Sequence, residues 1–117
     1  MVEFGVGILG TGKYLPERIL TNEDLEKMVD TSDDWIVRRT GMKRRHLLDD
    51  NTPSYVMGAE AAKLAIEDAG LTPSDIDLII VSTETPDYLS PSMACLIQKA
   101  INAENAAAFD VNAACTG

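Results

Sequence analysis

The sequence is poor in aromatic, histidine and cysteine residues, and it has no long apolar segment. Aromatic residues make up 5% of the 117 residues, and there are one histidine and two cysteines, Cys95 and Cys115. No Cys/His cluster has the spacing of a metal site, and no apolar run approaches the roughly 20 residues of a membrane span. The start MVEFGVGILG lacks the features of a signal peptide. We therefore expect a cytoplasmic protein with free thiols, no metal and no membrane contact.

Basic residues are also scarce, and they are unevenly distributed. Ten Lys and Arg residues stand against nineteen Asp and Glu residues, which gives a formal net charge of -9. This balance argues against nucleic-acid binding, because that function requires a basic surface. Half of the basic residues nevertheless fall in one short stretch: Arg38, Arg39, Lys43, Arg44 and Arg45. A local positive patch on an acidic chain favours an anionic ligand.

The order of apolar runs and helix signals predicts an α/β fold with a mostly parallel sheet. Short apolar runs bounded by turns predict three strands, at 2–10, 77–83 and 106–111. The second strand holds an unbroken apolar run, which is typical of a parallel strand covered on both faces. Two longer helices are expected, from Ser54 to Gly70 and from Ser90 to Ile101, the latter with Ser90 as N-cap and Pro91 at the first helical position.

A polar segment at about 13–53 separates the first predicted strand from the first long helix. It carries two capping-box signals, each a threonine followed three residues later by an aspartate, at Thr21 and Thr31. We expect short helices near 22–30 and 33–39. Because a featureless loop of this length is unusual, we interpret the segment as a helical insertion.

Gly5, Gly7 and Gly10 match the dinucleotide fingerprint GxGxxG in letters only. The glycines lie inside the predicted strand rather than in a turn after it, and no helix is expected to begin at Gly10. We therefore interpret them as small residues that allow close backbone packing.

Cys115 carries the strongest local signal for chemistry. It directly follows the third predicted strand, and its neighbours are all small: Ala113, Ala114, Thr116 and Gly117. A strand end projects the thiol, and small neighbours leave room for a substrate, as a nucleophile requires. A buried structural cysteine fits the same surroundings, and spacing alone does not decide between the two. We expect Cys95, in the middle of a predicted helix, to be structural.

Trp35 stands near two arginines, Arg38 and Arg39. A stacking ring beside a guanidinium suits a nucleotide such as the adenosine part of coenzyme A. A half-buried tryptophan beside solvated arginines fits the pattern equally, so both interpretations stay open. His46, the only histidine, lies in a basic run, and we interpret it as a surface or packing residue.

Motifs along nearly the whole chain resemble the β-ketoacyl-acyl-carrier-protein synthase III family. The resemblance implies a thiolase-like α/β fold, of which residues 1–117 would form an incomplete N-terminal half. The matching motifs are Gly10-Thr11-Gly12-x-Tyr14-Leu15-Pro16, Thr21-Asn22-x-Asp24-Leu25, Asp30-Thr31-Ser32-Asp33-Asp34-Trp35-Ile36, Arg39-Thr40-Gly41, Asp68-Ala69-Gly70, Pro91-Ser92 and Phe109-Asp110-Val111-x-Ala113-Ala114-Cys115-x-Gly117.

The resemblance also implies a reaction. Cys115 would accept an acyl group, typically acetyl, from acyl-CoA, and the acyl-enzyme would condense with malonyl-acyl-carrier protein to begin bacterial fatty-acid synthesis. Thr31, Trp35 and Arg39 would contact coenzyme A, and Ser90 would line the acyl pocket, where many members carry a phenylalanine. Acyl-CoA is then a substrate, so no cofactor is expected. The family resemblance further suggests a homodimer.

The family's catalytic histidine and asparagine come from a second half that this chain does not match. We therefore expect residues 1–117 alone to be inactive in condensation. One alternative is a related thiolase-fold acyltransferase, such as a 3-hydroxy-3-methylglutaryl-CoA synthase or a secondary-metabolite synthase, which would share Cys115. Another is a non-catalytic structural fragment.

Overall fold

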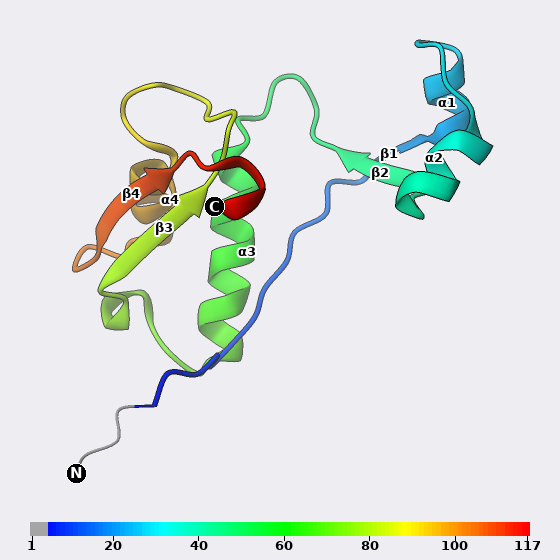
Figure 1. The fold of residues 1–117 in the computed structure, drawn as a ribbon. Helices are drawn as coiled ribbons and strands as arrows, with labels where there is room; N and C mark the ends of the chain where they lie inside the picture. The colour runs from blue at the N-terminus through cyan, green and yellow to red at the C-terminus, as the bar shows by residue number, and fades with distance from the viewer. Residues whose placement is uncertain (1–4) are drawn as a thin grey trace. The chain divides into compact units, whose positions relative to one another are not determined.

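The computed structural model describes residues 5–117, which form two compact units (Figure 1). The smaller unit is Leu15–Thr52. The larger unit combines the residues through Tyr14 with Pro53–Gly117. The smaller unit lies within the segment at about 13–53 for which we expect a helical insertion.

The larger unit is built on two parallel strands, β3 (Leu78–Ser82) and β4 (Ala107–Val111). Helix α4 (Met93–Ile101) connects them, and helix α3 (Tyr55–Asp68) packs against α4. A 3-10 turn, η1 (Pro73–Asp75), precedes β3. The two later strands and the two longer helices predicted from the sequence are thereby confirmed.

The core of the larger unit lies where α3, α4 and one face of the sheet meet. The two helices approach closely at Gly58, where an added Cβ would lie 2.5 Å from Cδ1 of Ile97. The buried core residues are Ala59, Met93, Ile97, Ile101, Ala103 and Ala106. Gly58 and Ala59 of α3 have the small side chains that allow this close helix packing, whereas Ala103 and Ala106 lie between α4 and β4.

Strand β3 is covered on one face only within the part of the chain that the structure describes. Ile79 and Val81 pack against the core, whereas Leu78 and Ile80 remain 48% and 55% exposed. Alternate residues of a strand point to opposite faces, so helices on one side shield only every second residue. The prediction of cover on both faces is wrong for the described residues.

Two remote carboxylates bind the first N–H groups of both helices. Asp110 of β4 accepts from the N–H groups of Met93 and Ala94, each at 2.7 Å. Asp87 accepts from the N–H groups of Ser54 and Tyr55 at 2.8 and 2.7 Å, and from Oγ of Ser54 at 2.7 Å. These N–H groups have no partner inside their helices, and a negative charge is favourable at a helix N-terminus. The two carboxylates therefore fix where α3 and α4 begin.

Two predicted N-caps are displaced along the chain. The N-cap of α4 is Ser92, whose Oγ accepts from the N–H of Cys95 at 3.2 Å, so the prediction of Ser90 is wrong. Ser92 has the extended backbone of an N-cap, while Ser90 and Pro91 lie before the helix, so the placement of Pro91 at the first helical position is wrong too. In the smaller unit, Ser32 rather than Thr31 caps the second helix through the N–H of Trp35 at 3.2 Å.

The first predicted strand, 2–10, is wrong where the structure describes it. Residues 5–10 form no strand, and Val6 and Ile8 are 103% and 87% exposed; residues 2–4 lie outside the described residues. A strand requires a neighbour for its backbone hydrogen bonds. No described strand pairs with this segment.

Gly10 packs against helix α3 instead. A Cβ at Gly10 would meet the carbonyl oxygen of Ala65 and would lie 2.5 Å from the backbone nitrogen of Ala69. This contact confirms the close-packing interpretation for Gly10, although Gly5 and Gly7 have nothing within 4 Å. No helix begins at Gly10, so the dinucleotide fingerprint is rejected on structural grounds too.

The smaller unit pairs two antiparallel strands, β1 (Arg18–Thr21) and β2 (Arg44–Leu47). Helices α1 (Asn22–Glu26) and α2 (Asp33–Thr40) lie between them in the chain. The two helices and the capping box at Thr21 are confirmed, although α1 ends earlier than expected. Neither strand is among those predicted from the sequence.

Replacing Asp110 with alanine should lower the free energy of unfolding by about 2 kcal/mol, because two N–H groups of α4 lose their acceptor. Asp110→Asn should lose less, since its amide oxygen still accepts a hydrogen bond. Urea unfolding followed by circular dichroism measures both. Asp77→Ala is the matched control, because the exposed Asp77 side chain makes no hydrogen bond among residues 5–117. Equal stability of the Asp110→Ala and Asp77→Ala variants would contradict the capping role.

Candidate functional site

The predicted site residues fall into two groups, one in each unit. Thr31, Trp35 and Arg39 lie at α2 in the smaller unit, and Ser90 and Cys115 lie in the larger one. Each group has its own geometry.

Cys115 lies in a 3-10 turn, η2 (Ala114–Thr116), directly after β4; Figure 1 shows this turn in red at the C-terminal end. Among the residues that the structure describes, nothing covers Cys115, which is exposed. Ala114 adopts a left-handed φ of 47°, which is uncommon for a residue other than glycine. The strand-to-turn corner predicted for Cys115 is therefore present.

Hydrogen bonds attach this turn to the end of β3. The N–H of Thr83 donates to the carbonyl of Val111 at 3.1 Å, and the N–H of Ala114 donates to Oε1 of Glu84 at 2.6 Å. Glu84 is not among the site residues predicted from the sequence. Its signal was its position just after a parallel strand, where functional side chains commonly gather.

Cys95 and Ser90, the other two candidates in the larger unit, have different surroundings from Cys115. Cys95 is partly buried in α4, and its Sγ lies 3.9 Å from the carbonyl oxygen of Ala108, in keeping with a structural cysteine. Ser90 is exposed in the loop between β3 and α4, beside the fully exposed Leu89.

Trp35 and Arg39 form one stacked pair on α2. The guanidinium carbon of Arg39 lies 4.6 Å from the centre of the Trp35 ring, within the range of a cation–π contact. Arg38 points to a different partner, since its Nε lies 3.0 Å from Oδ1 of Asp34. Trp35 remains 52% exposed, so part of the ring is open to a ligand.

A pocket of about 390 Å³ lies beside this ring. Two of the predicted residues, Thr31 and Trp35, line it together; its lining residues are Asp30, Thr31, Ser32 and Trp35. An open aromatic ring, a hydroxyl and an adjacent guanidinium can bind a planar base and a phosphate.

Asn22 holds the smaller unit together and fixes α2. It is 1% exposed, and its Nδ2 donates to Oδ1 of Asp33 and to the carbonyl of Met42, each at 2.8 Å. Its Oδ1 accepts from Nη2 of Arg45 at 2.7 Å, and its backbone N–H donates to the carbonyl of Lys43. A buried amide needs all of these partners. The network therefore links α1 to both α2 and β2.

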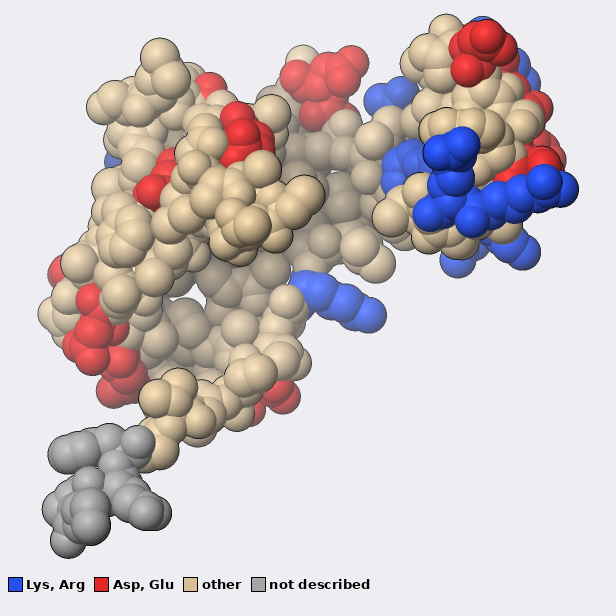
Figure 2. Space-filling view, viewed as in Figure 1, with Lys and Arg blue, Asp and Glu red and all other residues tan. Residues whose placement is uncertain are grey.

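The basic patch is only partly neutralised. Of its five residues, Arg38 pairs with Asp34 and Arg45 is bound to Asn22. Among residues 5–117, no ion pair involves Arg39, Lys43 or Arg44. Seven of the ten Lys and Arg residues lie in the smaller unit, where Figure 2 shows them gathered. This unit therefore offers free cationic groups to an anion.

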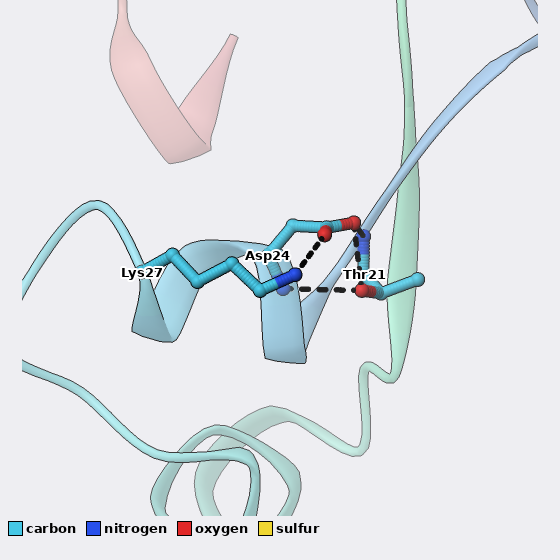
Figure 3. Close-up of polar contacts among 3 residues, drawn as sticks. All are labelled: Thr21, Asp24 and Lys27. Atoms are coloured by element: carbon cyan, nitrogen blue, oxygen red, sulfur yellow. Dashed lines mark hydrogen bonds and ion pairs between the residues drawn. The ribbon is translucent and has the colours of Figure 1, made fainter.

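The capping box at α1 joins Thr21, Asp24 and Lys27 (Figure 3). The hydroxyl of Thr21 donates to Oδ2 of Asp24 at 2.8 Å, Nζ of Lys27 donates to Oδ1 at 3.0 Å, and the N–H of Thr21 donates to Oδ2 at 3.2 Å. These bonds favour the ionised carboxylate and, led by the Thr21 hydroxyl, lower the pKa of Asp24 from 3.8 to about 2.

The remaining candidates have structural surroundings. Nδ1 of His46 lies 2.6 Å from the carbonyl oxygen of Pro16, which supports the packing interpretation. No group of three His, Cys, Asp or Glu side chains among residues 5–117 has the arrangement of a metal site. None of the helices described for this chain has both the length and the apolar character needed to cross a bilayer.

No protein-family model matches the chain, but it is similar to known proteins and solved structures. It is 56% identical over 115 residues to the β-ketoacyl-[acyl-carrier-protein] synthase III of Caldanaerobacter subterraneus subsp. tengcongensis, covering 98% of this chain and 35% of that protein. It also matches the crystal structure of 3-oxoacyl-[acyl-carrier-protein] synthase III from Aquifex aeolicus, with a TM-score of 0.88 and 50% identity over 97% of this chain and 36% of that one.

A third match is the priming β-ketosynthase of the R1128 polyketide biosynthetic pathway. Its TM-score is 0.86 at 37% identity, over 94% of this chain and 33% of that one. The chain therefore spans about a third of the length of the proteins it matches. Over that third, the predicted thiolase-like fold is confirmed.

The Asp24 carboxyl should titrate near pH 2, and Thr21→Val should move the midpoint toward 3.8, because the strongest hydrogen bond is lost. Since folding lowers this pKa, its contribution to stability is complete above about pH 3.8 and disappears as the pH falls through about 2. Carboxyl-carbon NMR measures the midpoint, and Thr85→Val is the control. A midpoint near 3.8 in the unmodified protein would refute the assignment.

Proposed function

The chain is a relative of the β-ketoacyl-[acyl-carrier-protein] synthases III over the third of those proteins that it spans, and we propose that Cys115 accepts an acyl group from a coenzyme A thioester. The observation that carries this proposal is the exposed Cys115 thiol in a turn directly after β4. Small neighbours on both sides leave space for an acyl chain.

The turn also offers a donor for the oxyanion of the tetrahedral intermediate. The N–H groups of Ala114, Thr116 and Gly117 are already hydrogen-bonded, to Glu84, Ala113 and Ala114 respectively. No hydrogen bond of the Cys115 N–H is found within residues 5–117. This N–H is therefore free to donate to the oxygen of the thioester carbonyl as that oxygen gains negative charge.

The chemistry would proceed in two steps. In the first, the Cys115 thiolate attacks the thioester carbonyl, and the coenzyme A thiolate leaves, so one thioester is exchanged for another. In the second, the intact enzyme would condense this acyl group with malonyl-acyl-carrier protein, releasing carbon dioxide and forming a 3-oxoacyl-carrier protein. This would start fatty-acid synthesis in the cytoplasm, with a homodimer as the expected assembly. The only histidine in this chain, His46, is bound to Pro16, so it is not assigned to this second step.

The smaller unit would bind the nucleotide part of coenzyme A. Arg39 covers one face of the Trp35 ring, and the exposed remainder would stack on the adenine. Thr31 lines the same pocket and would contact the base. Arg39, which has no ion-pair partner among the described residues, would meet the phosphates.

Ser90 would border the acyl pocket. Its small side chain is exposed in the loop after β3. A small residue here leaves room for primers longer or more branched than acetyl.

A priming ketosynthase of secondary metabolism is the second candidate. The R1128 enzyme supports it, with 37% identity and a TM-score of 0.86. It would share the acylation of Cys115 and differ in the carrier protein that it extends. Comparing condensation rates with fatty-acid and polyketide carrier proteins distinguishes the two.

Incubating the intact protein with radiolabelled acetyl-CoA should place one acetyl group on Cys115. Trypsin cleaves after Lys63 and Lys99, so Cys95 and Cys115 fall in different peptides and mass spectrometry separates them. Cys115→Ala should abolish the label, whereas Cys95→Ala should keep it. Absence of label in the unmodified protein, or label that persists in Cys115→Ala, would overturn the proposal.

Trp35→Ala and Arg39→Ala should each raise KM for acetyl-CoA about tenfold, because either change removes a stacking or phosphate contact. Arg38→Ala is the matched control: it removes the same charge from the same helix, but from a side chain already paired with Asp34. Steady-state kinetics measure the three variants. An equal effect of Arg38→Ala and Arg39→Ala would show that net charge matters and the stacked pair does not.

A further inference from the structure

We propose that Glu84 is a positioning residue for Cys115, because its carboxylate holds the turn in which the thiol lies. This inference rests on the proposed role of Cys115 and adds a residue that controls its geometry. Glu84 lies in the segment that follows β3, and Cys115 lies in the turn that follows β4. The parallel pairing of the two strands brings these ends together.

The carboxylate of Glu84 binds the turn at two points. Oε1 accepts from the backbone N–H of Ala114 at 2.6 Å. With its amide nitrogen facing Glu84, the side chain of Asn112 donates to Oε2 at 3.0 Å and to Oε1 at 2.6 Å. Glu84 therefore holds the residues on both sides of Ala113, just before the nucleophile.

The turn needs such an external contact because its backbone is strained. Ala114 has a φ of 47°, and a left-handed conformation is unfavourable for a residue with a Cβ. Conformations of this kind persist when surrounding contacts over-determine them. The bond from Ala114 N–H to Glu84 is one such contact, and it orients the peptide that precedes Cys115.

Glu84 is itself well anchored. The N–H of the preceding residue, Thr83, donates to the carbonyl of Val111 at 3.1 Å, which extends the pairing of β3 and β4 past the strand ends. Among residues 5–117, no Lys, Arg or His forms an ion pair with Glu84. Its partners are neutral N–H donors, so the geometry of its acceptor oxygens, rather than its charge, sets its role.

Three substitutions separate geometry from charge. Glu84→Gln keeps the length and an acceptor oxygen for Ala114, and the Asn112 amide can turn to accept from the new amide nitrogen. Glu84→Asp keeps the charge but shortens the side chain, so the carboxylate no longer reaches Ala114. Glu84→Ala removes both. Glu104→Ala, at an exposed glutamate without a side-chain hydrogen bond in the described chain, is the control.

The test is single-turnover acylation of Cys115 by acetyl-CoA in the intact protein. We expect Glu84→Ala and Glu84→Asp to lower the maximal acylation rate about tenfold or more without changing the acetyl-CoA concentration at half-maximal rate, since a misplaced thiol affects the reaction and not the binding. Glu84→Gln should retain a rate within about threefold of the unmodified protein. Unchanged acylation in Glu84→Ala, or a loss in Glu84→Gln as large as in Glu84→Asp, would overturn the proposal.

Hydrogen exchange of the Ala114 N–H gives a readout that does not depend on acyl transfer. It should be protected in the unmodified protein and in Glu84→Gln, and unprotected in Glu84→Asp and Glu84→Ala. If the unmodified protein is not acylated, the proposed function fails while this exchange pattern still decides the positioning role. Protection that survives in a folded Glu84→Asp variant would contradict it.

Discussion

The parallel pairing of β3 with β4 is the constraint on which the larger unit depends. Its register, from Leu78 opposite Ala107 to Ser82 opposite Val111, sets both strand ends at one edge of the sheet. The same pairing places Asp110 where its carboxylate meets the start of α4. The pairing of β3 with β4 thus positions both the start of α4 and the turn that contains Cys115.

The smaller unit depends on a polar centre instead of an apolar one. Asn22 is its one fully buried large side chain among the described residues, and it connects α1, α2 and β2 through hydrogen bonds. This network uses Arg45 internally, while Arg39 stacks on Trp35 and has no ion-pair partner among the described residues. Three arginines of this unit therefore have different partners: Arg45 binds Asn22, Arg38 pairs with Asp34, and Arg39 stacks on Trp35.

The elements that the sequence predicted well are those with strong local signals. The apolar run of β3, the alanine-rich face of α3 and the small residues around Cys115 each identify a local structure, and the family motifs identify the fold. The four-residue strands β1 and β2 were missed, because charged residues such as Arg18 and Arg44 obscure any alternation. The strand at 2–10 was expected from its short apolar run alone, although a strand depends on a neighbour that its own residues do not specify.

The starts of α3 and α4 and the turn at Cys115 also could not be predicted from the residues around them. Asp87 caps α3 through Ser54, 33 residues away in the chain, and Asp110 caps α4 through Met93, 17 residues away. Glu84 likewise binds Ala114, 30 residues away. Such contacts depend on the folded arrangement: the position of Glu84 just after a strand marks it as a candidate but does not name the residues it binds. The sequence therefore pointed to Cys115, the nucleophile that we propose, but not to Glu84, which binds its turn.

The most direct test of the account is protection of Cys115 from alkylation in the intact protein. Iodoacetamide should modify the exposed Cys115, and prior incubation with acetyl-CoA should block that modification until hydroxylamine cleaves the thioester. Cys95, read in its own tryptic peptide, is the internal reference and should be unaffected by acetyl-CoA. Alkylation of Cys115 at the same rate with and without acetyl-CoA would contradict its role as the acyl acceptor.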